Sequence, residues 1–324
     1  MSGKQTGVGV IGFGYWGPNL ARNFGRRPEC CLVAIGDIAE DRRAKAKLTY
    51  PGTDVLENGD AVIFHPDVDA VVIATPVSSH AALVENALKA GKDVLVEKPL
   101  TVTAAEAETL VDLAEKEGRI LAVDHTFLFN GAVRKLRELV ENGGLGDLIY
   151  LDSVRVNLGL FQSDINVIYD LAPHDLSIVL HLTDSRPRWV QAMGLRYGLE
   201  SAECLSYIHL EFDNGVVAHF HLSWISPVKL RRMIVAGSEK MAVYDDMNAG
   251  EKIKIFENLN WETLELIEAN KNYLIGLELI QDSQRVYPES QYFSHILGYV
   301  NQPSKKDLHL PYILKMPKLN IGQQ

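Results

Sequence analysis

Lys98 is the first residue whose position suggests acid–base chemistry. It follows the apolar run Val94–Val96, which is typical of a buried strand, and it stands between Glu97 and Pro99. An amine with the ordinary lysine pKa of about 10.4 is a poor base near neutrality, so catalysis would require desolvation or a neighbouring positive charge. The position alone leaves a second interpretation open, in which Lys98 is a solvated residue at the end of a strand.

Asp170 and His174 form the second group of candidates. They are four residues apart at the start of a predicted helix, so both would lie on one face of it. The positive end of that helix would stabilise the carboxylate and keep the imidazole neutral enough to accept a proton. Pro173 is acceptable only in a first turn, which supports this helix boundary. The alternative is an aspartate at the N-cap beside a packed histidine.

A glycine pattern near the start of the chain predicts a dinucleotide-binding loop. Gly12, Gly14 and Gly17 form G-x-G-x-x-G, which follows an apolar strand and leads into a helical segment. Gly12 would allow the tight turn, Gly14 the close approach of a pyrophosphate, and Gly17 the contact between helix and strand. Tyr15 and Trp16 complete this candidate cofactor site. The alternative is a glycine turn without a ligand.

Asp37 predicts which dinucleotide this loop would bind. It ends the second apolar run, where an acidic side chain can accept hydrogen bonds from the adenosine ribose. NAD is therefore favoured over NADP, although Arg42 and Arg43, just beyond, could accommodate a 2′-phosphate. Asp37 could also cap the next helix, and the two roles can coexist.

Further candidates for cofactor binding lie where the third and fourth predicted strands end. These strands end in Thr75-Pro76 and in Glu97-Lys98, at the carboxyl edge where doubly wound sheets bind their ligands. His80 begins the next helix on the same edge. A solvated polar residue at a helix N-terminus is an equally good interpretation of His80.

The elements that must position these residues alternate in the first part of the chain. Short apolar runs alternate with helical patterns, which predicts an α/β domain with a doubly wound parallel sheet over residues 1–124. Thr103 with Glu106 predicts a capping box, and Gly91 and Gly118 are placed to end helices. The runs lie at residues 7–14, 31–37, 69–76, 93–99 and 120–125.

The second part of the chain contains longer runs in which apolar and polar residues alternate. Six such runs lie between residues 146 and 257, which predicts an α+β domain with an open, mostly antiparallel sheet over residues 125–300. Asp213-Asn214-Gly215 predicts a hairpin turn between two strands. One face of such a sheet is free and could bind substrate or pair with another subunit, and we expect a homodimer or homotetramer through it. Residues 301–324 form a divergent tail with little helical periodicity.

Composition excludes several classes of function. The formal net charge of −10 over 324 residues argues against binding to nucleic acid. Three cysteines, two of them adjacent at Cys30 and Cys31, predict neither a disulfide framework nor a metal site. His219 and His221 share one face of a strand, which is more typical of a sheet surface than of a metal site. Without a signal-peptide pattern or a membrane-length apolar run, we expect a cytoplasmic protein that binds no membrane.

Together these motifs resemble the Gfo/Idh/MocA oxidoreductases, a family named for glucose-fructose oxidoreductase and inositol dehydrogenase. The resemblance rests on strand-GxGxxG-helix, on E-K-P after the fourth strand and on D-x-x-x-H in the second half, and it covers about residues 7–260. It implies a Rossmann domain followed by an open sheet domain. It also implies that Lys98 and His174 carry the proton chemistry and that Asp170 supports the histidine. Glu97 and Pro99 would fix Lys98 beside the nicotinamide.

The segments GYWGPNLARNF and GLFQSDINVIYDLAPHDLSI resemble the branch of this family associated with sugars and nucleotide sugars. The resemblance implies hydride transfer between a nicotinamide and a ring hydroxyl or ketone, with Asn157, Gln162, Tyr169 and His174 lining the substrate site. The first three could equally be loop or sheet residues with local partners. Alternative functions are a glycosidase that recycles NAD and a non-enzymatic regulator that binds a dinucleotide. Lys98, Asp170 and His174 together argue against the regulator, because a regulator does not need proton-transfer groups.

Overall fold

The computed structural model describes residues 4–159, 165–197, 202–248, 252–256, 299–301 and 321–323. The chain divides into residues 1–260 and residues 261–324, and each unit is described by itself. In the second unit β14 (Tyr299–Asn301) pairs with β15 (Ile321–Gln323) in antiparallel fashion. The rest of the predicted tail, and the end of the predicted second domain, lie outside the described residues. No helix in the described ranges is long and apolar enough to cross a membrane.

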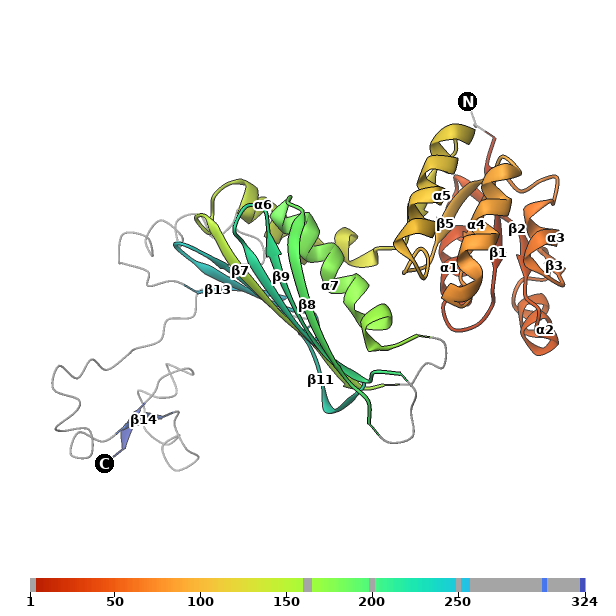
Figure 1. Ribbon diagram of the computed structural model, residues 1–324. Helices are drawn as coiled ribbons and strands as arrows, with labels where there is room; N and C mark the ends of the chain where they lie inside the picture. Colours follow the sequence, from red (N-terminus) through yellow and green to blue (C-terminus); the bar gives the residue numbers. More distant parts are fainter. Residues whose placement is uncertain are drawn as a thin grey trace. The chain divides into compact units, whose positions relative to one another are not determined.

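The first sheet of residues 1–260 has six parallel strands in the order β3-β2-β1-β4-β5-β6 (Figure 1). This is the order of a doubly wound dinucleotide-binding domain, with its reversal between β1 and β4. The strand β3 was not predicted, because three residues at a sheet edge carry too little apolar pattern. The strands are β1 (Thr6–Ile11), β2 (Cys30–Gly36), β3 (Asp54–Leu56), β4 (Ala70–Ile73), β5 (Asp93–Val96) and β6 (Leu121–Val123).

Helices cover both faces of this sheet because its strands are apolar on both sides. On β1, Val10 packs in one buried cluster with Leu20 of α1, whereas the next residue, Ile11, packs in another with Val84 of α4. Successive residues of a strand point to opposite faces, so the two clusters are the two sides of the sheet. The helices are α1 (Gly17–Gly25), α2 (Glu40–Thr49), α3 (Gly59–Ile63), α4 (His80–Lys89) and α5 (Ala104–Glu117), with a 3₁₀ turn, η1 (Val77–Ser79).

Three predicted helix ends in the first domain are confirmed. Thr103 and Glu106 form a capping box at the start of α5, and Gly118 ends that helix with φ of 59°. Gly91 follows α4 with φ of 73°. Only a residue without Cβ adopts such backbone angles at little cost, so these glycines set where the connections to β5 and β6 begin.

The second sheet has seven strands in the order β13-β12-β11-β7-β10-β9-β8. Only β7 and β10 pair in parallel fashion, so the prediction of a mostly antiparallel sheet is confirmed. The turn between β9 and β10 has φ of 83° at Gly215, as its sequence predicts. The strands are β7 (Leu148–Leu158), β8 (Pro187–Leu195), β9 (Leu205–Phe212), β10 (Val217–Ser223), β11 (Ile225–Gly237), β12 (Met241–Asp245) and β13 (Ile253–Phe256).

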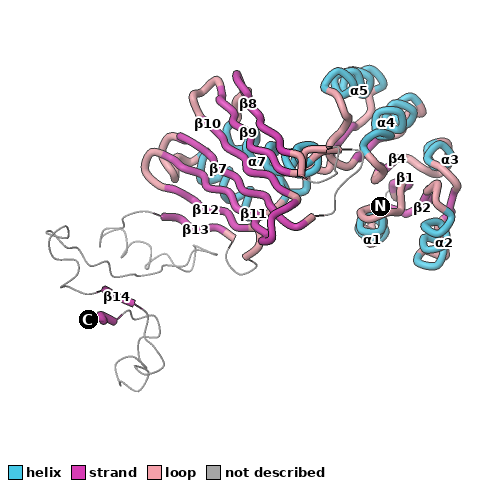
Figure 2. The backbone as a smooth tube through the Cα atoms, turned by 60° about the horizontal axis from the view of Figure 1, so that its bottom comes forward, coloured by secondary structure: helices cyan, strands magenta, loops and turns pink. Residues whose placement is uncertain are grey.

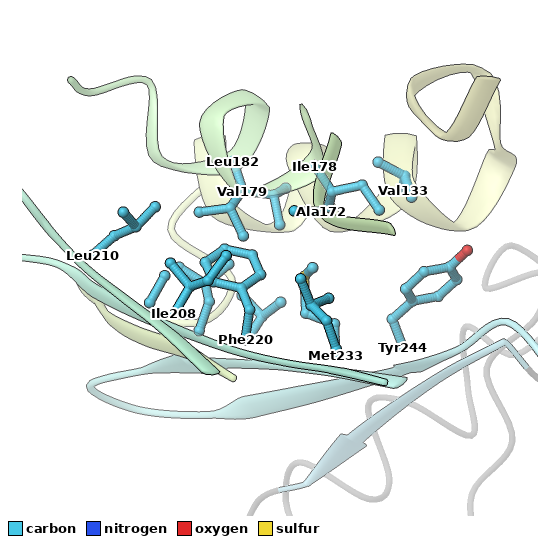
Figure 3. Packing of buried hydrophobic residues seen from close by; sticks show 14 of the residues in the cluster. Val133, Ala172, Ile178, Val179, Leu182, Ile208, Leu210, Phe220, Met233 and Tyr244 are labelled. Carbon is cyan, nitrogen blue, oxygen red and sulfur yellow. The ribbon is translucent and has the colours of Figure 1, made fainter. Parts of the chain in front are cut away.

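The helices α6 (Gly131–Glu141) and α7 (Val167–Thr183) lie along one face of this sheet, after the 3₁₀ turn η2 (Thr126–Phe129). Figure 3 shows Ile178 and Val179 of α7 packing onto Ile208 and Phe220 of the sheet. Phe220 is only 1% exposed. Truncating such a side chain to alanine costs about 3–5 kcal/mol, so this core holds α7 in place.

The opposite face of the seven-stranded sheet carries no described helix (Figure 2). Its edge strand β8 was not predicted. Every residue of β8 is exposed in this chain, so the strand lacks the apolar alternation by which a half-buried strand is found. The strand β9, which was predicted, buries one side with Ile208 and Leu210 and so shows this alternation.

Candidate active site

The glycine loop has the geometry that a dinucleotide requires. Gly12 has φ of 92°, and a Cβ there would lie 2.5 Å from the carbonyl oxygen of Ala74. A Cβ at Gly17 would lie 1.9 Å from the carbonyl oxygen of Gly12, so only glycine lets α1 start this close to β1. At Gly14 the nearest atom to a Cβ would be 3.4 Å away, in the Arg42 guanidinium. The backbone at Gly14 is therefore open to a ligand.

The start of α1 leaves room for an anion. No side chain caps its N-terminus, where unpaired N–H groups favour a negative charge. Trp16 is the N-cap residue and is 50% exposed, while Tyr15 is 83% exposed and meets the Trp16 ring edge to face at 5.6 Å. The loop, its open glycine and the uncapped helix fit the pyrophosphate of a dinucleotide.

Asp37 ties the end of β2 to this loop. It is 5% exposed, and its Oδ2 accepts the N–H of Phe13 at 2.7 Å while its Oδ1 accepts the N–H of Ala39 at 2.8 Å. Ala39 is the N-cap residue of α2 and no side chain caps this helix, so Asp37 fixes the turn before α2 and the helix-capping interpretation is wrong. Each carboxylate oxygen accepts a further bond, so the ribose-binding interpretation remains compatible with this geometry.

The two arginines beyond β2 differ in their contacts. Arg43 donates to the carbonyl oxygens of Asp37 and Ile38, at 2.9 and 2.8 Å, so its guanidinium serves the backbone. Arg42 lies 3.7 Å from the Asp37 carboxylate and is half exposed. Of the two, Arg42 is thus the one available to a 2′-phosphate.

His80 is a buried bridge and not a solvated residue. It is 1% exposed, its Nε2 lies 2.9 Å from the carbonyl oxygen of Thr75, and its Nδ1 lies 2.9 Å from that of Pro99. Both ring nitrogens are used within the protein, so His80 positions the ends of β4 and β5 and has no free nitrogen for a cofactor. The peptide bond between Lys98 and Pro99 is cis.

Lys98 lies beside Asp170, so the structure brings together the two groups of candidates. The ammonium Nζ donates to the Asp170 carbonyl oxygen at 2.6 Å and to its Oδ1 at 3.1 Å. Trp224 Nε1 donates to Oδ2 of the same carboxylate at 2.9 Å. With the Lys98 side chain only 12% exposed, the interpretation of Lys98 as a solvated strand end is wrong.

The helix that carries Asp170 starts earlier than expected. It begins at Val167, where Asn166 accepts the N–H groups of Ile168 and Tyr169, so Pro173 lies inside the helix and the predicted boundary is wrong. The sequence signal misled because asparagine caps this helix two turns upstream of the proline. A proline inside a helix removes one backbone donor and displaces the preceding turn. The carbonyl that loses its donor to Pro173 is that of Tyr169, and Lys98 donates to the next carbonyl, that of Asp170.

His174 is neutral in this site. Burial and the positive charges of Lys98, Arg155 and Arg231 lower its pKa to about 2. Burial, and not the helix end, is thus the main cause of its neutrality. Its Nδ1 is buried without a hydrogen-bond partner, and its ring packs against Phe127 at 5.0 Å. The Asp170 carboxylate is bound to Lys98 and Trp224, so the expected support of His174 by Asp170 has no direct contact here.

The buried ion pair of Arg155 and Asp175 was missed in the sequence. Three hydrogen bonds of 2.7–3.0 Å join them, and both side chains are 4% exposed. The Arg155 guanidinium also lies over the Phe127 ring at 4.6 Å from its centroid. The position of Asp175 directly after His174 was a signal that Asp175 lies near the site. Its partner is twenty residues away on β7, where no local pattern indicates the pairing.

A second missed feature is a pair of carboxyl groups, Glu97 and Asp124. Val96 pairs with Val123 in the sheet, so these residues end neighbouring strands. Burial and the charge of Asp124 raise the pKa of Glu97 to about 7, and burial raises the pKa of Asp124. His125 follows, with its Nδ1 buried and without a partner. Nothing in the pattern of residues 120–125 distinguished these side chains from strand ends.

The predicted substrate residues lie in different surroundings. Asn157 is half-buried near the end of β7, and Tyr169 donates its hydroxyl to the carbonyl oxygen of Val102 at 3.0 Å. Gln162 lies outside the described residues. Tyr169 is thus partly used in holding the loop after Pro99.

Comparison with known proteins decides the family. The profile described as "Oxidoreductase family, NAD-binding Rossmann fold" matches residues 6–125, and that described as "GFO/IDH/MocA C-terminal domain" matches residues 133–243. UDP-N-acetylglucosamine 3-dehydrogenase of Acidithiobacillus ferrooxidans is 31% identical over 248 residues, which are 74% of this chain and 74% of that protein. The chain belongs to the Gfo/Idh/MocA oxidoreductases. The resemblance found in the sequence is thereby confirmed.

Solved structures of similar proteins have the same fold. A putative oxidoreductase from Magnetospirillum magnetotacticum aligns with a TM-score of 0.71 and 31% identity, over 80% of this chain and 83% of that one. The crystallised A. ferrooxidans dehydrogenase aligns with a TM-score of 0.69 and 28% identity, over 82% and 88%. As a Gfo/Idh/MocA oxidoreductase, this chain carries an NAD-binding Rossmann domain, and the prediction of NAD is confirmed at that level.

Proposed function

We propose that this Gfo/Idh/MocA oxidoreductase is an NAD-dependent dehydrogenase that oxidises a ring hydroxyl of a sugar or nucleotide sugar, or reduces the corresponding ketone. The observation that carries the proposal is the Lys98–Asp170 contact, at 3.1 Å, beside a neutral His174 whose Nδ1 is unpartnered. The similarity to a UDP-N-acetylglucosamine 3-dehydrogenase and to a myo-inositol 2-dehydrogenase of Thermotoga maritima supports polyol or sugar substrates.

The residues that would hold the cofactor are those of the first sheet's carboxyl edge. The Gly12–Gly17 loop and the start of α1 would bind the pyrophosphate, and Asp37 would accept the hydroxyls of the adenosine ribose. NAD, when bound, supplies the nicotinamide that accepts or donates the hydride.

Lys98 and His174 divide the proton chemistry. Burial and the positive charges around it lower the pKa of His174 to about 2, so the ring is neutral at pH 7 and is a poor store for the hydroxyl proton. Its neutral ring can orient the hydroxyl through a hydrogen bond, for which Nε2 is the available nitrogen because Nδ1 is buried. Lys98 is the proton-transferring group, and Asp170 fixes the direction of its Nζ through two of its hydrogen bonds.

The decisive experiment is incubation with NAD⁺ and a panel of nucleotide sugars and polyols. Net accumulation of NADH with at least one of them is expected. Release of free sugar without net NADH would instead identify the glycosidase alternative, and binding without turnover across a broad panel would favour the regulator.

We infer further that the protein is a cytoplasmic homodimer or homotetramer. Three free thiols, at Cys30, Cys31 and Cys204, fit a reducing compartment. The uncovered face of the seven-stranded sheet presents Tyr207, 45% exposed, and the neighbouring Met193, 63% exposed, which a second copy could cover. Light scattering at micromolar concentration should give at least twice the monomer mass. The Met193→Glu variant should give a lower mass than the wild type. A monomeric wild-type protein would contradict this inference.

A further inference from the structure

Trp224 is bound to the Asp170 carboxylate but has no role in the chemistry assigned above. Its Nε1 donates to Asp170 Oδ2 at 2.9 Å, while Asp170 Oδ1 accepts a hydrogen bond from Lys98 at 3.1 Å. The two oxygens of one carboxylate are therefore bound to two different residues. Because hydrogen bonds to a carboxylate are directional, a donor at each oxygen resists rotation about the Cβ–Cγ bond. Trp224 thus helps to set the plane of the group that Lys98 meets.

The Trp224 indole has little freedom of its own. The residue is 1% exposed and belongs to the buried core of the second domain. Its backbone N–H donates to the Cys204 carbonyl at 2.9 Å, and its carbonyl accepts the N–H of Gly159 at 2.8 Å. A Cβ at Gly159 would lie 3.1 Å from Cδ1 of the indole, so the ring lies directly against this backbone. In a close-packed core such a ring is a fixed point to which the Asp170 carboxylate is attached.

Asp170 in turn offers two acceptors that orient the Lys98 nitrogen. Nζ donates to the Asp170 carbonyl oxygen at 2.6 Å and to Oδ1 at 3.1 Å. To accept the hydroxyl proton in the proposed reaction, Lys98 must be a neutral amine, which has two N–H bonds and one lone pair. When both N–H bonds are directed to Asp170, the lone pair takes the remaining tetrahedral position and points away from Asp170. The two contacts thereby set the direction from which Lys98 can take a proton.

We propose that Trp224 is a positioning residue for proton transfer, because it holds the Asp170 carboxylate in the orientation that directs Lys98. The inference rests on the proposed NAD-dependent function and deepens it. As the substrate hydroxyl is oxidised, its O–H bond breaks and a third N–H bond forms on Lys98, while the hydride passes from carbon to the cofactor. Without the indole N–H the carboxylate can turn, and Nζ then keeps only its bond to the Asp170 carbonyl. Trp224 takes no proton itself and acts through Asp170.

The variant that tests this role is Trp224→Phe, which removes the indole N–H and keeps an aromatic ring in the core. The rate of hydride transfer should fall by about 10- to 100-fold, because a small displacement of a reacting group has an effect of this order. The dissociation constant of NAD⁺ should stay close to the wild-type value, since the glycine loop and Asp37 are unchanged. The rate is measured by single-turnover reduction of NAD⁺ with the nucleotide sugar or polyol of the panel that gives the fastest NADH formation.

Phe212→Leu is the matched control for lost core packing. Phe212 is fully buried in the same core as Trp224. It is the last residue of β9, whereas Leu205, the first, pairs with Ser223, the residue before Trp224. The control therefore lies at the far end of the strand from the site. Both variants should lower Tm, but only Trp224→Phe should slow hydride transfer, and equal slowing in both would overturn the proposal.

A double-mutant cycle separates positioning through Asp170 from a general structural effect. Asp170→Ala removes the carboxylate, which is the group on which Trp224 acts. Trp224→Phe should therefore cause no further loss of rate in the Asp170→Ala background, whereas independent structural damage would slow hydride transfer by the same factor in both backgrounds. A full additional loss in Asp170→Ala would overturn the proposal, as would near-normal hydride transfer in folded Trp224→Phe.

A measurement on the indole itself covers the case in which Trp224→Phe does not fold. The chain has four tryptophans, whose indole N–H groups give separate signals in a proton–nitrogen correlation spectrum. Asp170→Asn replaces a charged acceptor by a weaker, neutral one, so one indole signal should move upfield and exchange faster with solvent. Indole signals that do not change in Asp170→Asn would overturn the proposal. A wild-type protein that binds NAD⁺ but reduces it with no compound of the panel would instead contradict the proposed function.

Discussion

Substitution of Lys98 by alanine separates a catalytic lysine from a structural one. The change removes the donor of two hydrogen bonds to Asp170 and leaves Trp224 bound to the carboxylate. Because Lys98 and Asp170 are 12% and 24% exposed, the loss should lower the free energy of unfolding by about 1–3 kcal/mol. Stability therefore changes under either interpretation. Turnover is the discriminating quantity, and it should fall by about 10²- to 10⁴-fold if Lys98 transfers the proton.

The assay is single-turnover reduction of NAD⁺ with a substrate found in the panel, together with a binding titration for each variant. Lys92→Ala is the matched control. Lys92 lies just before β5, at the end of the strand opposite to Lys98, and donates to the Val68 carbonyl at 2.6 Å. It should lose a similar buried hydrogen bond without losing turnover. Lys98→Arg should rescue poorly, since a guanidinium stays protonated. Near-normal hydride transfer in folded, NAD-bound Lys98→Ala would refute the role of Lys98.

Two further predictions concern His174 and Asp37. The pKa of His174 is lowered to about 2 in the folded state from an ordinary 6.5, so the unfolded state binds more protons between these values. Stability should therefore fall with decreasing pH below 6.5, by up to about 1.4 kcal/mol per unit from this group, and urea unfolding of His174→Gln should show a weaker dependence. NADH should bind more tightly than NADPH, and Asp37→Ala should reduce that preference. Tighter NADPH binding by the wild type would point to Arg42.

The sequence predicts the fold well where side-chain periodicity reports burial. Both sheets were found because Val10 and Ile11 bury opposite faces of β1, whereas Ile208 and Leu210 bury one face of β9. The same physics explains the failures. β3 is too short to show a period, and β8 buries neither side among the described residues, so it resembles a polar connection. Local capping signals succeeded at Thr103, where the partner is three residues away.

The candidate site was predictable only where its residues lie in motifs. Lys98 and His174 stand in recognisable patterns, and each was assigned before any contact was known. Asp170, the partner of Lys98, stands in the same motif as His174, but the buried pair of Arg155 and Asp175 was missed because its members are twenty residues apart on different elements. Such pairs depend on sheet register and helix packing. Neither the sheet register nor the helix packing can be read from a single sequence when the paired residues belong to no periodic pattern.

The contact between Lys98 and Asp170 makes the two halves of the site interdependent. β5 is hydrogen-bonded on both sides, to β4 and β6, so the end of this strand has little freedom. The helix α7 brings the carboxylate and the backbone carbonyl of Asp170 to the lysine. The same lysine charge contributes to the low pKa of His174. A displacement of α7 would therefore change the direction of Nζ and the electrostatic field at the imidazole together. Lys98 and His174 thus act as one unit, and the loss caused by removing either is not a separable share of catalysis.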